Sequence, residues 1–189
     1  MCIRDRGRIL IVPFFVLAFY LPGFYGDLTA LILFLVASFT DFLDGMLARF
    51  LGEESKLGEL LDPIADKIIV ATALILLVMD GTIISYEVIA AIIILTREIL
   101  ISGLREFLAK GKIKLPVSNL AKLKTVLQMV SIALLLSGET GNKIINFQDY
   151  NAQTIGIILL WLSAALTLFT GYEYMRRGID HAISEDNKD

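Results

Sequence analysis

Long apolar stretches separated by short polar segments make up almost the whole chain. Six such stretches span residues 9–22, 28–43, 64–80, 83–104, 122–138 and 154–174. Most of them fall within the roughly 17–25 residues with which a helix crosses the hydrocarbon core of a bilayer. The pattern therefore predicts an all-α integral membrane protein whose six transmembrane helices form one bundle.

The composition agrees with this prediction. Hydrophobic residues make up 56% of the 189 residues and the mean hydropathy is +0.72, which is too apolar for a soluble domain of this size. The sequence has no evident internal repeat, so we expect a single transmembrane domain over residues 1–180. Residues 181–189 form a polar tail that we expect to be disordered.

The basic residues are distributed unevenly among the polar segments. They gather before the first apolar stretch, between the second and third, between the fourth and fifth, and after the sixth. The three alternate loops, 22–27, 80–86 and 139–153, contain only Lys143. Because basic loops stay on the cytoplasmic side of a membrane, we predict that both termini are cytoplasmic. The formal net charge of −3 adds little, since acids and bases lie in different segments.

Cysteine and histidine exclude several kinds of site. Cys2 is the only cysteine, which rules out an internal disulfide and a thiolate metal cluster. His181 is the only histidine and lies in the polar tail, which argues against a histidine-based metal or nucleophile site. The basic N-terminus resembles a signal peptide, but no small-residue cleavage site follows it, so we expect the first helix to be retained. The opening MCIRDR is a poor start for a helix, and we expect the native start to be missing or replaced.

Four aspartates lie at the ends of two neighbouring predicted helices. Asp41 and Asp44 end the second apolar stretch, and Asp62 and Asp66 begin the third. On helices, spacings of three and four place each pair on one face. A carboxylate at the bilayer centre costs about 2.5–3.5 kcal/mol even on the lenient insertion scale. Four carboxylates this close to lipid need a compensating charge, and a divalent metal ion supplies one.

The residue types in this cluster suit a hard metal ion and a phosphate. Carboxylate oxygens favour Mg²⁺ or Mn²⁺ over zinc or copper, and two helix ends with two acids each suit two ions about 3.5–4 Å apart. Gly45 and Ala48 leave space for a ligand beside the first pair, and Gly58 does so before Asp62. Arg49 offers a bidentate fork for a phosphate oxygen or for one of the acids.

Two other interpretations of these acids remain open at this point. Aspartates near helix ends are commonly caps or surface charges, and Arg49 and Lys67 are close enough in sequence to neutralise them as ion pairs. Acids within a membrane also line the cation pathways of channels and transporters. A cation pathway needs acids near the midplane of several helices, whereas these four lie at two adjacent ends. The combination of four acids and two glycines therefore favours a metal site.

The cluster resembles the signature of the CDP-alcohol phosphotransferase family of membrane enzymes. From Asp41 to Asp66 it follows the pattern D-x-x-D-G-x-x-A-R, eight residues, then G-x-x-x-D-x-x-x-D. Eight fixed positions over 26 residues make the match specific, and the six-helix layout agrees with it. The resemblance implies that a CDP-linked lipid donates its phosphatidyl group to an alcohol and releases CMP.

The resemblance also implies roles for single residues. Two metal ions would be bound by the four aspartates and would clamp the diphosphate. Asp66 would also act as the general base for the acceptor hydroxyl. The CDP-lipid would lie against Asp41, Asp44, Gly45, Ala48, Arg49 and Gly58. The family further implies a homodimer that contacts membrane lipids, with no nucleic-acid partner.

Basic residues on the predicted cytoplasmic side indicate a phosphorylated acceptor. Arg97 lies well inside an apolar stretch, where an unpaired charge is costly, and Arg105 follows eight residues later on roughly the same face. Lys122 and Lys124 begin the fifth predicted helix. We predict that these four residues bind the phosphate of the acceptor. Ordinary positive-inside topology or lipid headgroups are the alternative explanation, least so for Arg97.

These basic segments resemble the phosphatidylglycerophosphate synthase branch of the family. They follow the patterns R-E-I-x-x-S-x-L-R-E from Arg97 and K-x-K-T-x-x-Q from Lys122. The branch implies CDP-diacylglycerol as donor, glycerol 3-phosphate as acceptor, and a bacterial inner membrane with the active site facing the cytoplasm. Ala121 departs from the glycine of many relatives, and only Arg8-Ile9 remains of the usual opening segment. Alternatives are cardiolipin or phosphatidylinositol phosphate synthesis within the family, and a cation-coupled transporter outside it.

Overall fold

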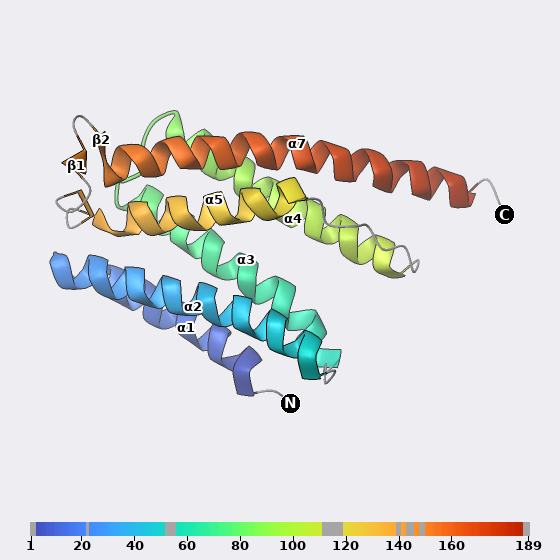
Figure 1. Ribbon diagram of the computed structural model, residues 1–189, viewed down its shortest axis with the longest axis horizontal. Helices are drawn as coiled ribbons and strands as arrows, with labels where there is room; N and C mark the ends of the chain where they lie inside the picture. Colours follow the sequence, from blue (N-terminus) through green and yellow to red (C-terminus); the bar gives the residue numbers. More distant parts are fainter. Residues whose placement is uncertain are drawn as a thin grey trace.

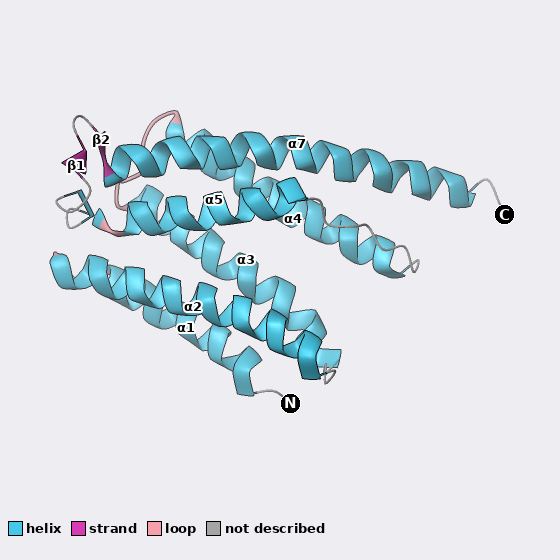
Figure 2. Cartoon of the chain, in the orientation of Figure 1, coloured by secondary structure: helices cyan, strands magenta, loops and turns pink. Residues whose placement is uncertain are grey.

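Helices make up nearly all of the described chain (Figures 1 and 2). The computed structural model describes residues 3–21, 23–51, 56–110, 119–138, 141–142, 146–147 and 150–186. Within these ranges, side chains are described except at 3–10, 41–51, 56–66, 107, 109–110, 146–147, 150, 177 and 179–186.

The helices are α1 (Ile3–Phe19), α2 (Phe24–Leu51), α3 (Lys56–Met79), α4 (Glu87–Lys110), α5 (Asn119–Leu136) and α7 (Ala152–Asp186). A pair of two-residue antiparallel strands, β1 (Asn146–Phe147) and β2 (Tyr150–Asn151), precedes α7. The all-α prediction is confirmed for the described residues, apart from this short hairpin.

Each predicted apolar stretch lies mainly in one helix, and the helices continue past it at one end of the bundle. α2 ends at Leu51 where the apolar stretch ends at residue 43, and α3 begins at Lys56 where the stretch begins at residue 64. α4 likewise continues to Lys110. Once a helix has formed, each added residue gains a hydrogen bond at little cost, so the polar turns stay helical. Hydropathy locates the apolar part of a helix but not these extensions, which carry Asp44 and Asp62 of the aspartate cluster.

The same effect changes the expectation for the C-terminal tail. α7 continues through Asp186, so the backbone of residues 181–186 is helical, although the polar composition predicts disorder from residue 181. A helix that is already 29 residues long at Asp180 extends over further polar residues without a new nucleation cost. Residues 187–189 lie outside the described part of the chain.

The helices form two groups of three that pack against each other. α1 contacts α2 and α3, and α7 contacts α4 and α5, while α2 and α3 contact the second group through α5 and α4. The chain runs up and down, so the first residues of α1, α3 and α5 and the last residues of α2, α4 and α7 lie at the same end of the bundle, on the right in Figure 1. Because this end carries the helical extensions, it brings the aspartate segments and the basic segments to one side of the molecule.

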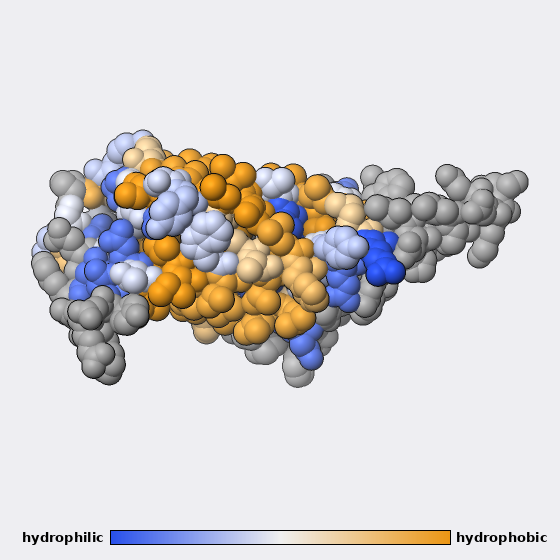
Figure 3. Space-filling view, turned by 90° about the horizontal axis from the view of Figure 1, so that it is seen from above, coloured by the Kyte–Doolittle hydropathy of each residue, from blue (hydrophilic) through white to orange (hydrophobic). Residues whose placement is uncertain are grey.

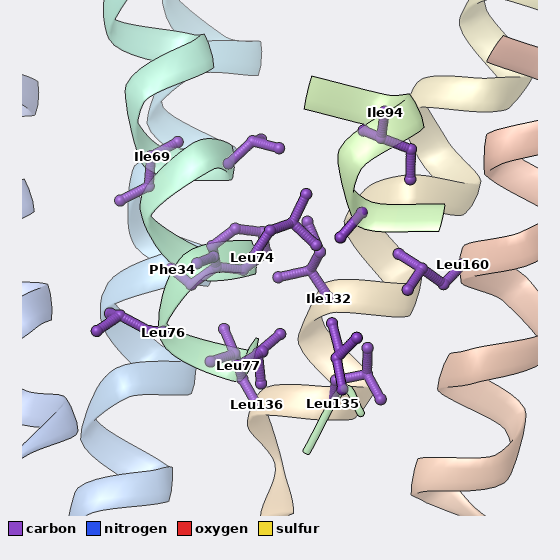
Figure 4. Packing of buried hydrophobic residues seen from close by; sticks show 14 of the residues in the cluster. Phe34, Ile69, Leu74, Leu76, Leu77, Ile94, Ile132, Leu135, Leu136 and Leu160 are labelled. Atoms are coloured by element: carbon purple, nitrogen blue, oxygen red, sulfur yellow. The ribbon is translucent and has the colours of Figure 1, made fainter. Parts of the chain in front are cut away.

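The interior contains side chains from every helix. Figure 4 shows Phe34 of α2, Leu74 of α3, Ile94 of α4, Ile132 of α5 and Leu160 of α7 in one cluster. Buried alanines on α2, α3, α4 and α7 belong to the same core, and small residues let helix backbones approach closely. The two groups of helices therefore share one apolar core rather than forming two separate domains.

The outer surface is also apolar. A hydrophobic band crosses the middle of the face seen in Figure 3, with hydrophilic residues at both ends. Large apolar side chains exposed on the described helices include Phe14, Ile32, Phe39, Ile75, Ile92, Val126, Ile158 and Phe169. By length and composition, two described helices can cross a membrane, namely Asn119–Leu136 and Ala152–Arg176. An exposed band of this kind is typical of a surface that faces lipid.

Candidate active site

A cluster of charged side chains lies where α4, α5 and α7 meet, and Lys124 within it is buried. The Nη1 atom of Arg97 donates a hydrogen bond to Oε1 of Glu98 at 3.1 Å. The Nζ atom of Lys124, on the neighbouring helix α5, donates to the same Glu98 oxygen. The side chains of Arg97, Glu98 and Lys124 are only 10%, 20% and 5% exposed. One carboxylate therefore holds two cations together inside an otherwise apolar bundle.

One face of helix α7 contributes hydroxyl groups that lie beside these charged residues. The Nη2 atom of Arg97 donates to Oγ1 of Thr170 at 3.2 Å, and the hydroxyl of Ser163 donates to the backbone carbonyl of Lys124 at 3.3 Å. The residues of this face recur at helical spacing and are all buried, namely Ser163, Thr167, Thr170, Gly171 and Tyr174. Small and hydroxyl side chains let α7 approach α4 and α5 closely, and the hydroxyls of Thr170 and Ser163 hydrogen-bond to these two helices.

Arg105 joins the cluster through Tyr174. Its Nη2 atom donates to the Tyr174 hydroxyl at 2.9 Å, and its guanidinium carbon lies 4.8 Å from the centre of the ring, which is a cation–π arrangement. The positive charge of Arg105 is close enough to repel those of Arg97 and Lys124. The structure thus brings together three of the four basic residues that the sequence assigns to the acceptor phosphate.

The fourth residue, Lys122, is exposed and lies on a different side of α5 from Lys124. Two residues apart on an α-helix lie roughly 200° apart around its axis. The same geometry separates Tyr172, which is 71% exposed, from Tyr174, which is 4% exposed. A tyrosine near the end of a membrane helix commonly lies at the membrane interface, but Tyr174 is buried because its face of α7 is turned toward α4 and α5.

A pocket of about 360 Å³ connects this cluster to α3. Its polar lining consists of Lys67, Glu98, Ser102, Lys124, Thr125 and Gln128, and its remaining lining is mainly apolar residues of α3, α4 and α5. Lys67 directly follows Asp66 in α3. The pocket therefore begins one residue beyond the last aspartate of the acid cluster and ends at the buried Lys124.

The predicted metal and CDP-lipid residues lie outside the described side chains. Their backbone is described and is helical, so Asp41 and Asp44 are about one turn apart in α2, and Asp62 and Asp66 in α3. These two helices are in contact. The metal site stays a prediction, which rests on the preference of Mg²⁺ and Mn²⁺ for carboxylate oxygens. Gly45, Ala48, Arg49 and Gly58 likewise lie where only the backbone is described.

Comparison with known proteins decides the family. A model of the family described as CDP-alcohol phosphatidyltransferase matches residues 6–169 of the chain. The chain belongs to the CDP-alcohol phosphatidyltransferase family. The match spans the aspartate cluster, the pocket and about the first half of α7. The site residues Thr170, Gly171 and Tyr174 follow the last matched residue.

Curated relatives of this phosphatidyltransferase are named CDP-diacylglycerol–glycerol-3-phosphate 3-phosphatidyltransferase. The relative from Rickettsia felis is 41% identical over 170 residues, which cover 90% of each chain. The relative from Cereibacter sphaeroides is 35% identical over 94% of each chain. The relative from Yersinia enterocolitica is 38% identical over 89% of this chain and 88% of its own.

Several residues that support the basic cluster of this phosphatidyltransferase, formed by Arg97, Arg105 and Lys124, could not be recognised from the sequence. Glu98, Ser163 and Thr170 carry its hydrogen bonds. A signal for Glu98 was present, since it is an acid adjacent to Arg97 within an apolar stretch and so a natural counterion. The α7 residues gave no comparable signal, because serine and threonine are ordinary within membrane helices. Their partners are also distant in the sequence, since Arg97 is 73 residues from Thr170 and Lys124 is 39 residues from Ser163.

Proposed function

We propose that this phosphatidyltransferase transfers the phosphatidyl group of CDP-diacylglycerol to sn-glycerol 3-phosphate, giving phosphatidylglycerol phosphate and CMP. The names of its relatives support this donor and this acceptor. The pocket between α3, α4 and α5 carries this proposal. Its lining includes Lys67, which directly follows Asp66 in the sequence, and the buried Lys124, which donates a hydrogen bond to Glu98. This arrangement puts phosphate-binding groups next to the segment that carries the aspartates.

The acceptor phosphate fits the charge of this site. Among the described side chains, Arg97, Arg105, Lys124 and Lys67 all lie close enough to Glu98 or to one another to interact electrostatically. Charge-assisted hydrogen bonds to phosphate are among the strongest that side chains make, and arginine forms them in a bidentate manner. Glu98 keeps the two innermost cations close together in the absence of substrate, so the site does not have to assemble them when the acceptor binds.

In the proposed reaction, the acceptor hydroxyl attacks the phosphorus atom that carries diacylglycerol. A bond forms from the hydroxyl oxygen to this phosphorus, and the bond from phosphorus to the departing CMP oxygen breaks. Asp66 takes the proton of the hydroxyl, and CMP leaves with the bonding electron pair. Two Mg²⁺ or Mn²⁺ ions bound by Asp41, Asp44, Asp62 and Asp66 would neutralise the charge that develops on the diphosphate.

We further propose that all six helices span a bacterial inner membrane, with both termini and the active site in the cytoplasm. The exposed apolar band supports this topology. Exposed aromatic residues also lie near the two ends of the band, as expected for residues at membrane interfaces. Tyr20, Tyr25 and Tyr86 lie at the end of the bundle where α1 ends and α2 and α4 begin, and Tyr172 lies toward the opposite end. The family resemblance supports a homodimer.

The proposed function is tested by measuring CMP release from CDP-diacylglycerol. We expect purified protein in detergent with Mg²⁺ to release CMP when glycerol 3-phosphate is added, and to stop when the metal is chelated. Inositol phosphate, serine and phosphatidylglycerol are the matched alternative acceptors. Release with one of these instead would contradict the acceptor assignment but keep the family reaction. Cation flux into liposomes without CMP release would contradict the enzyme mechanism.

Replacing Lys124 with methionine is expected to weaken acceptor binding. We expect the apparent KM for glycerol 3-phosphate to rise roughly 10- to 100-fold, since a hydrogen bond to a charged group contributes about 1.5–3 kcal/mol. The KM for CDP-diacylglycerol should change little. Lys122→Met is the control, because Lys122 is exposed, and we expect an increase below about threefold. Equal effects of the two substitutions would show that the buried position of Lys124 does not matter.

A further inference from the structure

Gly171 of α7 lies directly against the side chain of Arg97. A Cβ atom at this position would be 3.1 Å from Cγ and 3.4 Å from Nε of Arg97. The arginine side chain therefore passes over a helix surface that has no side chain of its own at this point. Its guanidinium group is held beyond the glycine by the hydrogen bond to Thr170, the residue before Gly171.

The position of the guanidinium leaves its Nε–H group without a hydrogen-bond partner among the described residues. This Nε atom of Arg97 is buried, while Nη1 and Nη2 are bonded to Glu98 and Thr170. A buried donor without a partner is costly, and an anionic oxygen of a ligand can satisfy it. A methyl group at position 171 would lie beside this donor.

We propose that Gly171 is a positioning residue, which together with Thr170 sets the depth and direction of Arg97 for binding the acceptor phosphate. This inference rests on the proposed function, because it assigns a purpose to the arginine of that site. Adding one methyl group at position 171 displaces the Arg97 stem by a few tenths of an ångström or forces it into another rotamer. Because phosphate recognition depends on the direction of the guanidinium fork, such a shift weakens acceptor binding.

The simpler explanation is that Gly171 only allows α7 and α4 to pack closely. Small residues commonly serve this purpose between membrane helices. The chain contains a matched position that separates the two explanations. Gly178, seven residues later on the same face of α7, would place a Cβ atom 3.1 Å from both terminal methyl groups of Leu104 in α4. Alanine at 178 therefore imposes a similar steric load between the same two helices, but on an apolar side chain.

The test compares Gly171→Ala with Gly178→Ala in the full-length protein. The apparent KM for glycerol 3-phosphate, the KM for CDP-diacylglycerol, kcat and the melting temperature are measured for each. We expect Gly171→Ala to raise the acceptor KM about three- to tenfold, since a displacement of 1 Å costs up to about 100-fold. The donor KM and the melting temperature should stay near wild type. Gly178→Ala should leave all these quantities near wild type.

A second variant tests the same role through a different contact. Thr170→Val keeps the shape of the side chain but removes the acceptor for Nη2 of Arg97, so it should also raise the acceptor KM. Thr170→Ser restores a hydroxyl and should bring the KM back toward the wild-type value. Recovery with serine is the result that a purely structural role for this position would not give.

The outcomes distinguish this inference from the proposed function. If wild-type protein uses glycerol 3-phosphate but Gly171→Ala keeps the wild-type KM, or if Gly178→Ala raises KM equally, the positioning role is wrong and the function stands. If the wild type uses another acceptor, the acceptor assignment is wrong, and the same comparison with that acceptor decides on Gly171. Binding of inorganic phosphate, measured by calorimetry, gives an independent readout, and equal affinity of wild type and Gly171→Ala would overturn the inference.

Discussion

Replacing Asp66 with asparagine is expected to abolish CMP release while leaving the protein folded. Asparagine has nearly the same shape as aspartate but cannot accept the proton of the acceptor hydroxyl and is a weak metal ligand. Loss of a general base alone lowers rates by roughly 10²–10⁴-fold, and loss of a metal ligand adds to this effect. Asp62→Asn should act in the same direction through the metal site. The measurement is CMP release per mole of folded protein, with glycerol 3-phosphate in excess.

Asp80→Asn is the matched control for this experiment. Asp80 directly follows α3 at the opposite end of the bundle, is exposed, and accepts a hydrogen bond from Thr82. Its substitution removes the same charge from the same part of the sequence without touching the candidate site, so activity should stay near wild type. Normal turnover in both Asp62→Asn and Asp66→Asn would contradict the metal-site proposal. Raising the Mg²⁺ concentration should rescue Asp62→Asn better than Asp66→Asn if Asp66 is also the base.

Replacing Glu98 with glutamine is expected to destabilise the protein more than any other single polar substitution in the basic cluster. Glu98 is the carboxylate to which both Arg97 and Lys124 donate hydrogen bonds. Without it, two mostly buried cations face each other. Removing one partner of a buried ion pair costs about 3–5 kcal/mol, and since Glu98 is 20% exposed we expect a value near the lower end. The measurement is the free energy of unfolding in mixed detergent micelles.

Two further variants test the physical reason for this loss. Glu106→Gln removes a carboxylate from an exposed position of the same helix, and we expect a change within about 0.5 kcal/mol. Adding Lys124→Met to Glu98→Gln removes one of the two unpaired cations, so the double variant should be more stable than the sum of the single effects predicts. Strict additivity would mean that Glu98 and Lys124 do not interact, contrary to the contact between them.

The sequence alone predicted the helices because their signal is local. An apolar stretch of sufficient length is helical wherever it meets lipid or a protein core, since its backbone groups must bond within the segment. The helix ends were harder, as α2 and α3 show: their polar turns continue the helix without any apolar signal. Arg97 and Lys124 were identifiable as candidates because a charge inside an apolar stretch is costly wherever the stretch lies.

The sequence by itself determined the helix content, the family signature from Asp41 to Asp66 and the candidate basic residues. Only the tertiary structure decided that Lys124 is buried and Lys122 exposed, and that Gly171 lies against Arg97. These facts depend on how each helix is rotated about its axis and on contacts between segments as far apart in the sequence as Arg97 and Gly171. Rotation is set by the packing of all the helices at once, and no local pattern encodes it.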